Sequence, residues 1–418
     1  MNLFQKNQIE YYLILLIPFS AVISIFFLEV SLIIITGTFL FKSLRDKEFK
    51  YFNNKFFLLF LIFYFYILVR YFFIEKDYFF WSSSIIFYFR FGLYAIALWY
   101  FLKNIFNLDK HFTYSVFICF TILAIDGMFQ FTFGKNLIGF AIQEKGRLSS
   151  FFGDELILGS YLVRLLPFIY ILLLKNLNKN KDYILSLLLI ILCDVIIFLS
   201  GERAAAGLMI IQTLYFLIML KRIRFMRMLS IIVSSIIIVL ILMNSTDVKN
   251  RMVNTTSKEL KENNRVNNSI FPYEDLKFGY YFISPTHTNY LYTSINMFKK
   301  NFLFGQGPKS YRYYCSDEKY KINTFSCATH PHNFYVQMLA ELGIIGLGFL
   351  CFVFFFVIWK SLNILFTKSN KDQSYLICLL SFFLINLWPL TSSGNFFNNW
   401  LSIIMFVPVS FLLYKVQK

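Results

Sequence analysis

Two histidines and one arginine are the residues of this sequence whose types and positions could do chemistry. His330 and His332 flank a proline just before an apolar segment, and Arg203 lies between two other apolar segments. Histidine is the natural proton acceptor near neutral pH. Arginine keeps its charge and binds phosphate through a planar fork. Together they predict a displacement at a sugar carbon, in which histidine takes a proton from an acceptor hydroxyl and arginine stabilises a leaving diphosphate.

A polar stripe follows the histidines. Asn333, Gln337 and Glu341 recur every four residues, so on a helix they share one face, which we expect to look into a helix bundle rather than into lipid. We therefore predict that His330, Asn333 and Glu341 contact the substrate beside His332. Gly343, Gly346 and Gly348 lie on the next turns and predict close packing against another helix.

Arginines at the ends of apolar segments are the next candidates. Arg203 has Glu202 as its neighbour among small residues, which favours a ligand-facing arginine over one that only reaches lipid headgroups. Arg147 lies among glycines and hydroxyl residues before another apolar segment, and we predict that it binds substrate. For Arg164, deeper in that segment, Asp194 is a possible buried partner, and the pair would then be structural.

The long polar segment before the histidines holds three arginines and two cysteines. Arg251, Arg265 and Arg312 are by themselves ordinary solvated charges. Cys315 and Cys327 are either free thiols or, in an oxidising compartment, a disulfide that would contribute about 2–4 kcal/mol; we predict the disulfide. No cysteine and histidine spacing typical of zinc is present, so no metal site is predicted.

The elements that must position these residues are membrane helices. Of the 418 residues, 58% are hydrophobic and only 15% charged, which excludes a soluble enzyme, a disordered chain and a nucleic-acid-binding domain. We predict an all-α polytopic integral membrane protein with about twelve transmembrane helices. These are at residues 11–27, 29–43, 56–75, 82–102, 111–133, 155–174, 183–200, 204–220, 228–244, 333–359, 374–392 and 397–414.

Charge asymmetry predicts the orientation. The termini and one set of short connections hold twenty Lys and Arg, against six in the short connections of the other side, so we predict that both termini are cytoplasmic. The chain then divides into helices one to nine at 1–244, one large outer loop at 245–332 and helices ten to twelve at 333–418. The net charge of +17 thus reflects topology, and no nucleic-acid partner is expected.

The order of these motifs resembles the O-antigen ligase and polymerase superfamily of bacterial envelope proteins. The resemblance covers about residues 110–400 and rests on an ordered set. The set comprises Asp126-Gly-Met-Phe-Gln130, Gly146-Arg-Leu-Ser-Ser-Phe-Phe-Gly-Asp154, Leu199-Ser-Gly-Glu-Arg203-Ala, and a loop with Gly305-Gln-Gly307 that ends in His330-Pro-His-Asn333 and Glu341-Leu-Gly343. It implies a GT-C-like fold in the bacterial inner membrane, with the large loop in the periplasm.

The resemblance also implies a reaction. A glycan would pass from an undecaprenyl-diphosphate carrier to an acceptor hydroxyl, with inversion and with no metal or other cofactor. The acceptor would be lipid A-core for a ligase, or a second lipid-linked glycan for a polymerase. By position, Arg203 would hold the diphosphate and His332 would activate the acceptor. One arginine among Arg251, Arg265 and Arg312 would assist.

Two other functions stay open from the sequence. A small-anion transporter needs a polar lining that continues to the cytoplasmic half, but Leu347 to Ile358 are almost wholly apolar, which argues against it. A non-catalytic scaffold of an envelope complex would tolerate the loss of His332. Between ligase and polymerase, we predict the ligase.

Overall fold

The computed structural model describes residues 7–73, 80–177, 180–262, 285–366 and 371–416, and within these ranges the protein is built from helices. Each predicted membrane segment corresponds to a helix. These are α2 (Gln8–Ile23), α3 (Ile25–Arg45), α4 (Lys55–Phe72), α6 (Phe89–Asn104), α7 (Leu108–Phe133), α8 (Leu158–Lys175), α9 (Asn180–Leu199), α10 (Arg203–Met219), α11 (Arg224–Asn244), α16 (Phe334–Phe366), α17 (Lys371–Asn386) and α18 (Asn399–Val416).

Nine helices of the described ranges have the length and composition to cross a membrane. One of them includes the 3₁₀ turn η1 (Phe80–Tyr88), which leads directly into α6. The helices α2, α10 and α17 are apolar but shorter. The protein is therefore an all-α polytopic membrane protein, and the total of twelve crossings stays a prediction.

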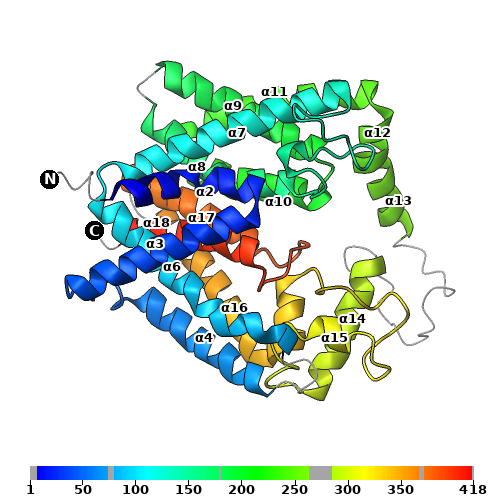
Figure 1. Cartoon of the computed structure of the whole chain (residues 1–418). Coiled ribbons are helices and arrows are strands. Elements are labelled where there is room, and N and C mark those ends of the chain that lie inside the picture. The colour runs from blue at the N-terminus through cyan, green and yellow to red at the C-terminus, as the bar shows by residue number, and fades with distance from the viewer. Residues whose placement is uncertain (1–6, 74–79, 178–179, 263–284, 367–370, 417–418) are drawn as a thin grey trace.

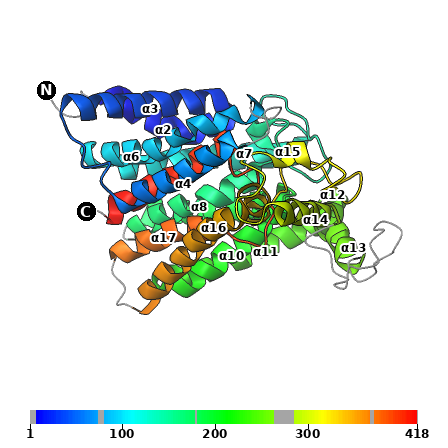
Figure 2. The same cartoon turned by 90° about the horizontal axis from the view of Figure 1, so that it is seen from below.

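The helices run side by side, and both termini lie at one end of the bundle (Figure 1, Figure 2). The opposite end carries the short helices of the long polar segment, α12 (Thr246–Lys249), α13 (Thr255–Glu262), α14 (Pro285–Lys300) and α15 (Tyr311–Tyr314). This arrangement agrees with an even number of crossings and with one large loop at the end away from the termini. We refer to the end with α12–α15 as the outer end.

Helix α8 lies at the centre of the bundle and α11 at its edge. Helix α8 packs against α7, α9, α10 and α17, and 83% of its apolar span is buried, against 17% for the span that contains α11. A helix that is apolar all round belongs to a protein interior or to a membrane span, so lipid can cover α11 where protein covers α8. The charged Arg164 on α8 is enclosed by protein, with 6% of its surface exposed.

Helix α16 is broken at Gly343, where the backbone has φ 64° and ψ −159°. The carbonyls of Ala340 and Glu341 accept hydrogen bonds from the N–H groups of Gln306 (3.0 Å) and Gly307 (2.8 Å). A Cβ on Gly343 would lie 2.5 Å from the backbone of Leu303, so only glycine fits. The close contact at Gly343 is therefore made by a loop and not by a neighbouring helix, whereas a Cβ on Gly346 would meet Leu342 of the same helix and one on Gly348 nothing within 4 Å.

The expected pair between Arg164 and Asp194 is wrong. Asp194 on α9 pairs with Arg227 of α11, with one carboxylate oxygen 2.5 Å and the other 3.2 Å from the two terminal guanidinium nitrogens. Arg164 instead donates to the Asn386 side chain at 2.8 Å and to the Ser160 carbonyl at 2.9 Å. Arg227 falls in a segment that the charge count assigned to a cytoplasmic connection, but the structure buries it inside α11.

Candidate functional site

Asp126 and Gln130 on α7 hold the loop that follows this helix. One carboxylate oxygen of Asp126 accepts from the Leu137 N–H at 2.8 Å, and the other accepts from the Ser150 hydroxyl at 2.5 Å. The Gln130 carbonyl accepts from the N–H groups of Ser149 (3.1 Å) and Ser150 (2.8 Å). Because both side chains are fully buried, their polar atoms must be satisfied, and the loop satisfies them. The motif Asp126-Gly-Met-Phe-Gln130 thus positions the loop that contains Gly146 to Asp154.

The loop that Asp126 and Gln130 hold presses against the joint between α9 and α10. Gly201 has φ +68°, and a Cβ there would lie 2.6 Å from the Arg147 side chain. The Arg251 side chain donates to the Gly201 carbonyl at 3.2 Å. Arg203 begins α10 two residues further on. Three of the predicted site residues, Arg147, Arg203 and Arg251, therefore gather at this joint, and we call them the joint arginines.

Glu202, next to Arg203, holds the start of α8. Its carboxylate accepts from the backbone N–H groups of Gly159 (2.7 Å) and Ser160 (3.2 Å), and from the Ser160 hydroxyl (2.5 Å). The first N–H groups of a helix have no partner within the helix, and a carboxylate there is favoured by the helix dipole. The presence of a carboxylate next to Arg203 is thus explained by the cap that Glu202 forms on α8.

The two histidines lie together at the outer end. The ring centroids of His330 and His332 are 4.1 Å apart. His332 has φ +54° and lies two residues before the first residue of α16, outside the helix. The loop after α17 holds the pair, because the Ser393 N–H donates to the His332 carbonyl at 2.8 Å and the Ser393 carbonyl lies 3.3 Å from Nε2 of His330.

Two residues of α14 complete the surroundings of His332 and were not predicted. The ring of Tyr290 stacks on that of His332 at 5.5 Å, and the ring of His287 lies 5.9 Å from it. No spacing in the sequence points to either, since about forty residues separate them from His332. Burial lowers the pKa of His332 from its usual value, and burial followed by the charge of His332 lowers the pKa of His330 to about 4. Both imidazoles are therefore neutral at pH 7 and able to accept a proton.

Asn333 and Glu341 are buried and bonded to protein. Asn333 caps α16 by accepting from the N–H groups of Tyr335 and Val336, and its amide donates to the carbonyls of Pro389 (2.8 Å) and Thr391 (3.1 Å).

Glu341 holds the turn of residues 309–311. Its carboxylate accepts from the Lys309 N–H at 2.9 Å, from the Tyr311 N–H at 3.2 Å and from Gln337 at 3.0 Å. The polar stripe does face the bundle interior, as predicted, since Asn333, Gln337 and Glu341 are each at most 2% exposed. These buried side chains position two loops, the turn of residues 309–311 and the loop that contains Pro389 and Thr391.

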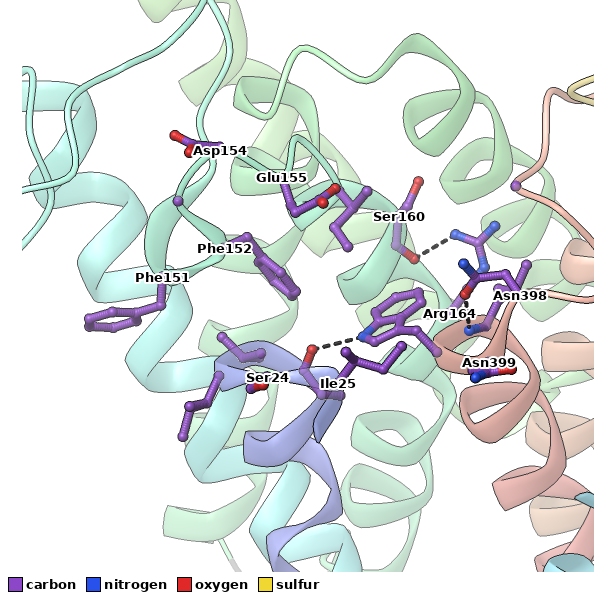
Figure 3. Close-up of a pocket in the computed structure, with 18 of the residues that line it drawn as sticks. Ser24, Ile25, Phe151, Phe152, Asp154, Glu155, Ser160, Arg164, Asn398 and Asn399 are labelled. Carbon is purple, nitrogen blue, oxygen red and sulfur yellow. Dashed lines mark hydrogen bonds between the residues drawn. The ribbon is translucent and has the colours of Figure 1, made fainter. Parts of the chain in front are cut away.

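A cavity of about 1320 Å³ opens between the histidines and the start of α8. Its lining comes from the α2–α3 turn, α7, the loop before α8, residues 309–330 and the segment that leads into α18. Figure 3 shows Arg164, Ser160, Asn398 and Asn399 on one side of it, with Phe151 and Phe152 across from them. His330 and Arg312 also line the cavity, whereas the joint arginines are not among the described residues that do.

Lys309 supplies a further charge to this cavity. Its ammonium donates to the Ser84 hydroxyl at 2.6 Å. Burial, then the nearby Arg312 guanidinium, lowers the pKa of Lys309 to about 8, so the side chain is still mainly a cation at pH 7. Sequence reasoning missed Lys309, because a lysine in a long polar segment has no pattern that separates it from its solvated neighbours.

The Cys315–Cys327 disulfide is present and lies beside the turn that carries Arg312. Cys315 is buried in a small cluster with Tyr311, Tyr314 and Tyr320. Tyr311 also donates its hydroxyl to the Ser326 carbonyl at 2.7 Å. Arg312 is therefore presented from a turn fixed on both sides. Arg265 lies outside the described residues.

The fold and the site thus define a polytopic membrane protein with arginines, paired histidines and a polar cavity at one end of its helix bundle. Residues 185–353 match a family model described as O-Antigen ligase. This part begins within α9 and includes the α9–α10 joint, the long polar segment and both histidines. Over these residues the chain is similar to the O-antigen ligase family, which supports the superfamily that the order of its motifs indicates. No curated protein matches the chain.

Proposed function

We propose that the protein is a membrane glycosyltransferase that moves a glycan from an undecaprenyl-diphosphate carrier to an acceptor hydroxyl at the periplasmic face of the bacterial inner membrane. The proposed reaction is that of an O-antigen ligase, with lipid A-core as the acceptor. The alternative within the same chemistry is an O-antigen polymerase, in which the acceptor is a second lipid-linked glycan. Both termini would be cytoplasmic.

The observation that carries the proposal is the gathering of arginines at the α9–α10 joint within the matched segment. Arg147 and Arg251 both contact Gly201, and Arg203 starts the adjacent helix. Each guanidinium can bind a diphosphate through its planar fork, and three guanidinium groups at one backbone turn suit its charge. Arg147 also pairs with the Glu144 carboxylate at 3.2 Å. Arg203 is the central member in this proposal, with Arg147 and Arg251 as its assistants.

His332 is the proposed proton acceptor. The acceptor hydroxyl gives its proton to the neutral imidazole, and its oxygen forms the new bond to the anomeric carbon. The bond between that carbon and the carrier diphosphate breaks, and the diphosphate leaves with the electron pair. The arginines stabilise the added negative charge. A single displacement of this kind inverts the anomeric centre. Asn333 and Glu341 act by holding the loops around the histidines.

Two substitutions test the proposal, read as the polysaccharide ladder on a lipopolysaccharide gel. Arg203→Ala and His332→Asn should each abolish long-chain polysaccharide. Asparagine tolerates positive φ, so the second change removes the base and keeps the backbone turn. Arg222→Gln is a matched loss of charge on the exposed connection before α11 and should leave the ladder normal. Normal ladders from both site variants would overturn the proposed roles.

The gel of the null mutant separates the two candidate reactions. Loss of every glycan on the lipid A-core indicates a ligase, because attachment itself is then missing. One repeat unit on the core indicates a polymerase, because attachment continues without chain extension.

The pH profile tests the base directly. The folded pKa of His332 is lowered, so its neutral form is present at pH 7 and is lost as the pH falls through that lowered value. Transfer by the purified protein should therefore be constant above pH 7 and fall by half only below about pH 6.5, the ordinary histidine value. A rate that rises as the pH falls would show that the histidine acts as an acid.

A further inference from the structure

The cavity beside the histidines is distinct from the joint arginines, and its two walls differ in chemistry. One wall carries Arg164, Asn398 and Asn399, and the rings of Phe151 and Phe152 lie across from them, on the side of Asp154 and Glu155 (Figure 3). We propose that this cavity is the acceptor site and that it takes a lipid-anchored saccharide bearing a phosphate group, which Arg164 binds. This inference rests on the proposed glycosyl transfer and names the place of its second substrate.

Arg164 is the first argument. Only 6% of its surface is exposed, and its side chain lines the cavity. A guanidinium has five N–H donors. One is bonded to Asn386 and one to the Ser160 carbonyl, and the other three have no hydrogen bond within the described part of the chain. Buried charged donors without partners are costly, so the cavity has to supply an acceptor for them. A phosphate oxygen does so while also matching the charge.

Other charges around the cavity are divided between its sides. Lys309 and Arg312 line it together with His330, and Asp154 and Glu155 line it near the start of α8. Glu202 touches the same region through Ser160, whose hydroxyl bonds to its carboxylate. Cations for the phosphate and carboxylates for sugar hydroxyls are thus both present. A plain hydrocarbon would leave them unsatisfied.

The apolar wall indicates where the lipid tail lies. Ile23 and Ile25 flank the turn between α2 and α3, and Ile122 lies on α7; all three line the cavity and are 69%, 46% and 43% exposed. These isoleucines give the cavity an exposed apolar surface, on which an acyl or prenyl chain can lie while its headgroup reaches Arg164.

Two substrates require two sites in a single displacement, because donor and acceptor must be bound at the same time. The joint arginines suit the donor diphosphate, and the cavity has its own buried arginine. His330 lines the cavity, and the ring centroid of His332 lies 4.1 Å from that of His330, so the proposed base is one side chain away from the bound acceptor. Ser160 joins the two regions, since it bonds both Glu202 of the joint and Arg164 of the cavity.

Lipid binding to the purified full-length protein, measured by native mass spectrometry, tests the assignment. The two probes are bisphosphorylated lipid A, which represents the ligase acceptor, and undecaprenyl diphosphate, which represents the polymerase acceptor. Arg164→Gln should weaken the binding of one probe about tenfold, and Arg203→Gln should change that binding less than twofold. If undecaprenyl diphosphate is the acceptor lipid, two copies should bind, and each variant should remove a different one.

A second pair of variants keeps the test decisive if Arg164→Gln does not fold. Ile122→Trp fills the apolar wall and leaves every charge in place, and it should reduce binding of the same probe about tenfold. Ile118→Trp is its control, since Ile118 is 51% exposed one turn earlier on α7 and does not line the cavity; binding should stay within twofold of the wild type.

Some outcomes overturn the assignment. One such outcome is that Arg164→Gln and Ile122→Trp both bind the two probes as the wild type does. The other is that Arg164→Gln and Arg203→Gln lose the same bound lipid. The proposed transfer would survive either result if His332→Asn still abolished the ladder. It fails separately if His332→Asn and Arg203→Ala keep the ladder.

Discussion

Among the residues that the structure describes, two arginines are buried within membrane helices, and their side chains have different partners. Arg227 on α11 is 4% exposed and holds the carboxylate of Asp194 with two nitrogens. Arg164 on α8 is 6% exposed and holds the neutral side chain of Asn386 and a backbone carbonyl. The nearest carboxylate in its network, that of Glu202, is bonded to the start of α8 through Gly159 and Ser160.

The difference separates a structural charge from an available one. The Asp194 carboxylate neutralises the charge of Arg227 in direct contact. This arginine therefore links α11 to α9 and is not available to bind another anion. Neutral partners orient Arg164 but leave its charge directed at a cavity. Whether a buried arginine in a membrane protein is structural or available to a ligand therefore depends on its partners and not on its burial.

Arg227→Met should have the largest effect on stability. The change leaves the Asp194 carboxylate buried without a partner, and breaking a buried ion pair in this way costs about 3–5 kcal/mol. Thermal unfolding of the detergent-purified protein measures it. The double variant Arg227→Met with Asp194→Leu should recover most of the loss, because it removes both charges. A single variant as stable as the wild type would show that Asp194 is not ionised in the fold.

Asn386→Ala should have an intermediate effect. The change removes the partner of the Arg164 Nε–H and leaves a buried donor unsatisfied, at a cost of about 1–3 kcal/mol. Unfolding is measured as for Arg227→Met. The comparison predicts that this variant still binds the acceptor probe, because the charge of Arg164 remains. Loss of stability as large as that of Arg227→Met would contradict the distinction between the two arginines.

Glu202→Gln should have the smallest effect. The amide oxygen can still accept from the N–H of Gly159, but the charge at the start of α8 is lost, which costs about 0.3–1 kcal/mol. With one negative charge fewer beside Ser160, binding of a phosphate-bearing probe at Arg164 should strengthen rather than weaken. Weaker binding together with an unchanged unfolding temperature would show that Glu202 itself contacts the ligand.

Some of the site could be predicted from sequence because its signals are local. Every segment that hydropathy located corresponds to a helix, and the position of Cys315 and Cys327 in one outer segment indicated the disulfide, whereas α12–α15 of the polar segment were not predicted. The stripe of Asn333 and Glu341 correctly indicated a buried face. The function of that stripe was not predictable, because a buried polar side chain can face a substrate or a loop, and only the loop of residues 303–311 shows which.

The sequence could not predict which charged side chains pair with each other. Asp194 could meet Arg164 or Arg227, since spacing along the chain does not say which helices are neighbours. The predicted helix of residues 333–359 also gave no sign that Gly343 would admit a segment forty residues earlier. His287 and Tyr290 reach His332 in the same way, across a chain separation that carries no pattern.

The sequence by itself determined that this protein is a bundle of membrane helices, and it predicted candidate arginines and histidines at one end. Hydrophobic length and charge content are sufficient for that, since lipid admits only helices whose backbone groups are satisfied internally. Only the tertiary structure decided which arginine is neutralised and which faces a cavity. That outcome depends on contacts between α8, α9, α11 and α17, and electrostatic energy depends on distance and burial rather than on order along the chain.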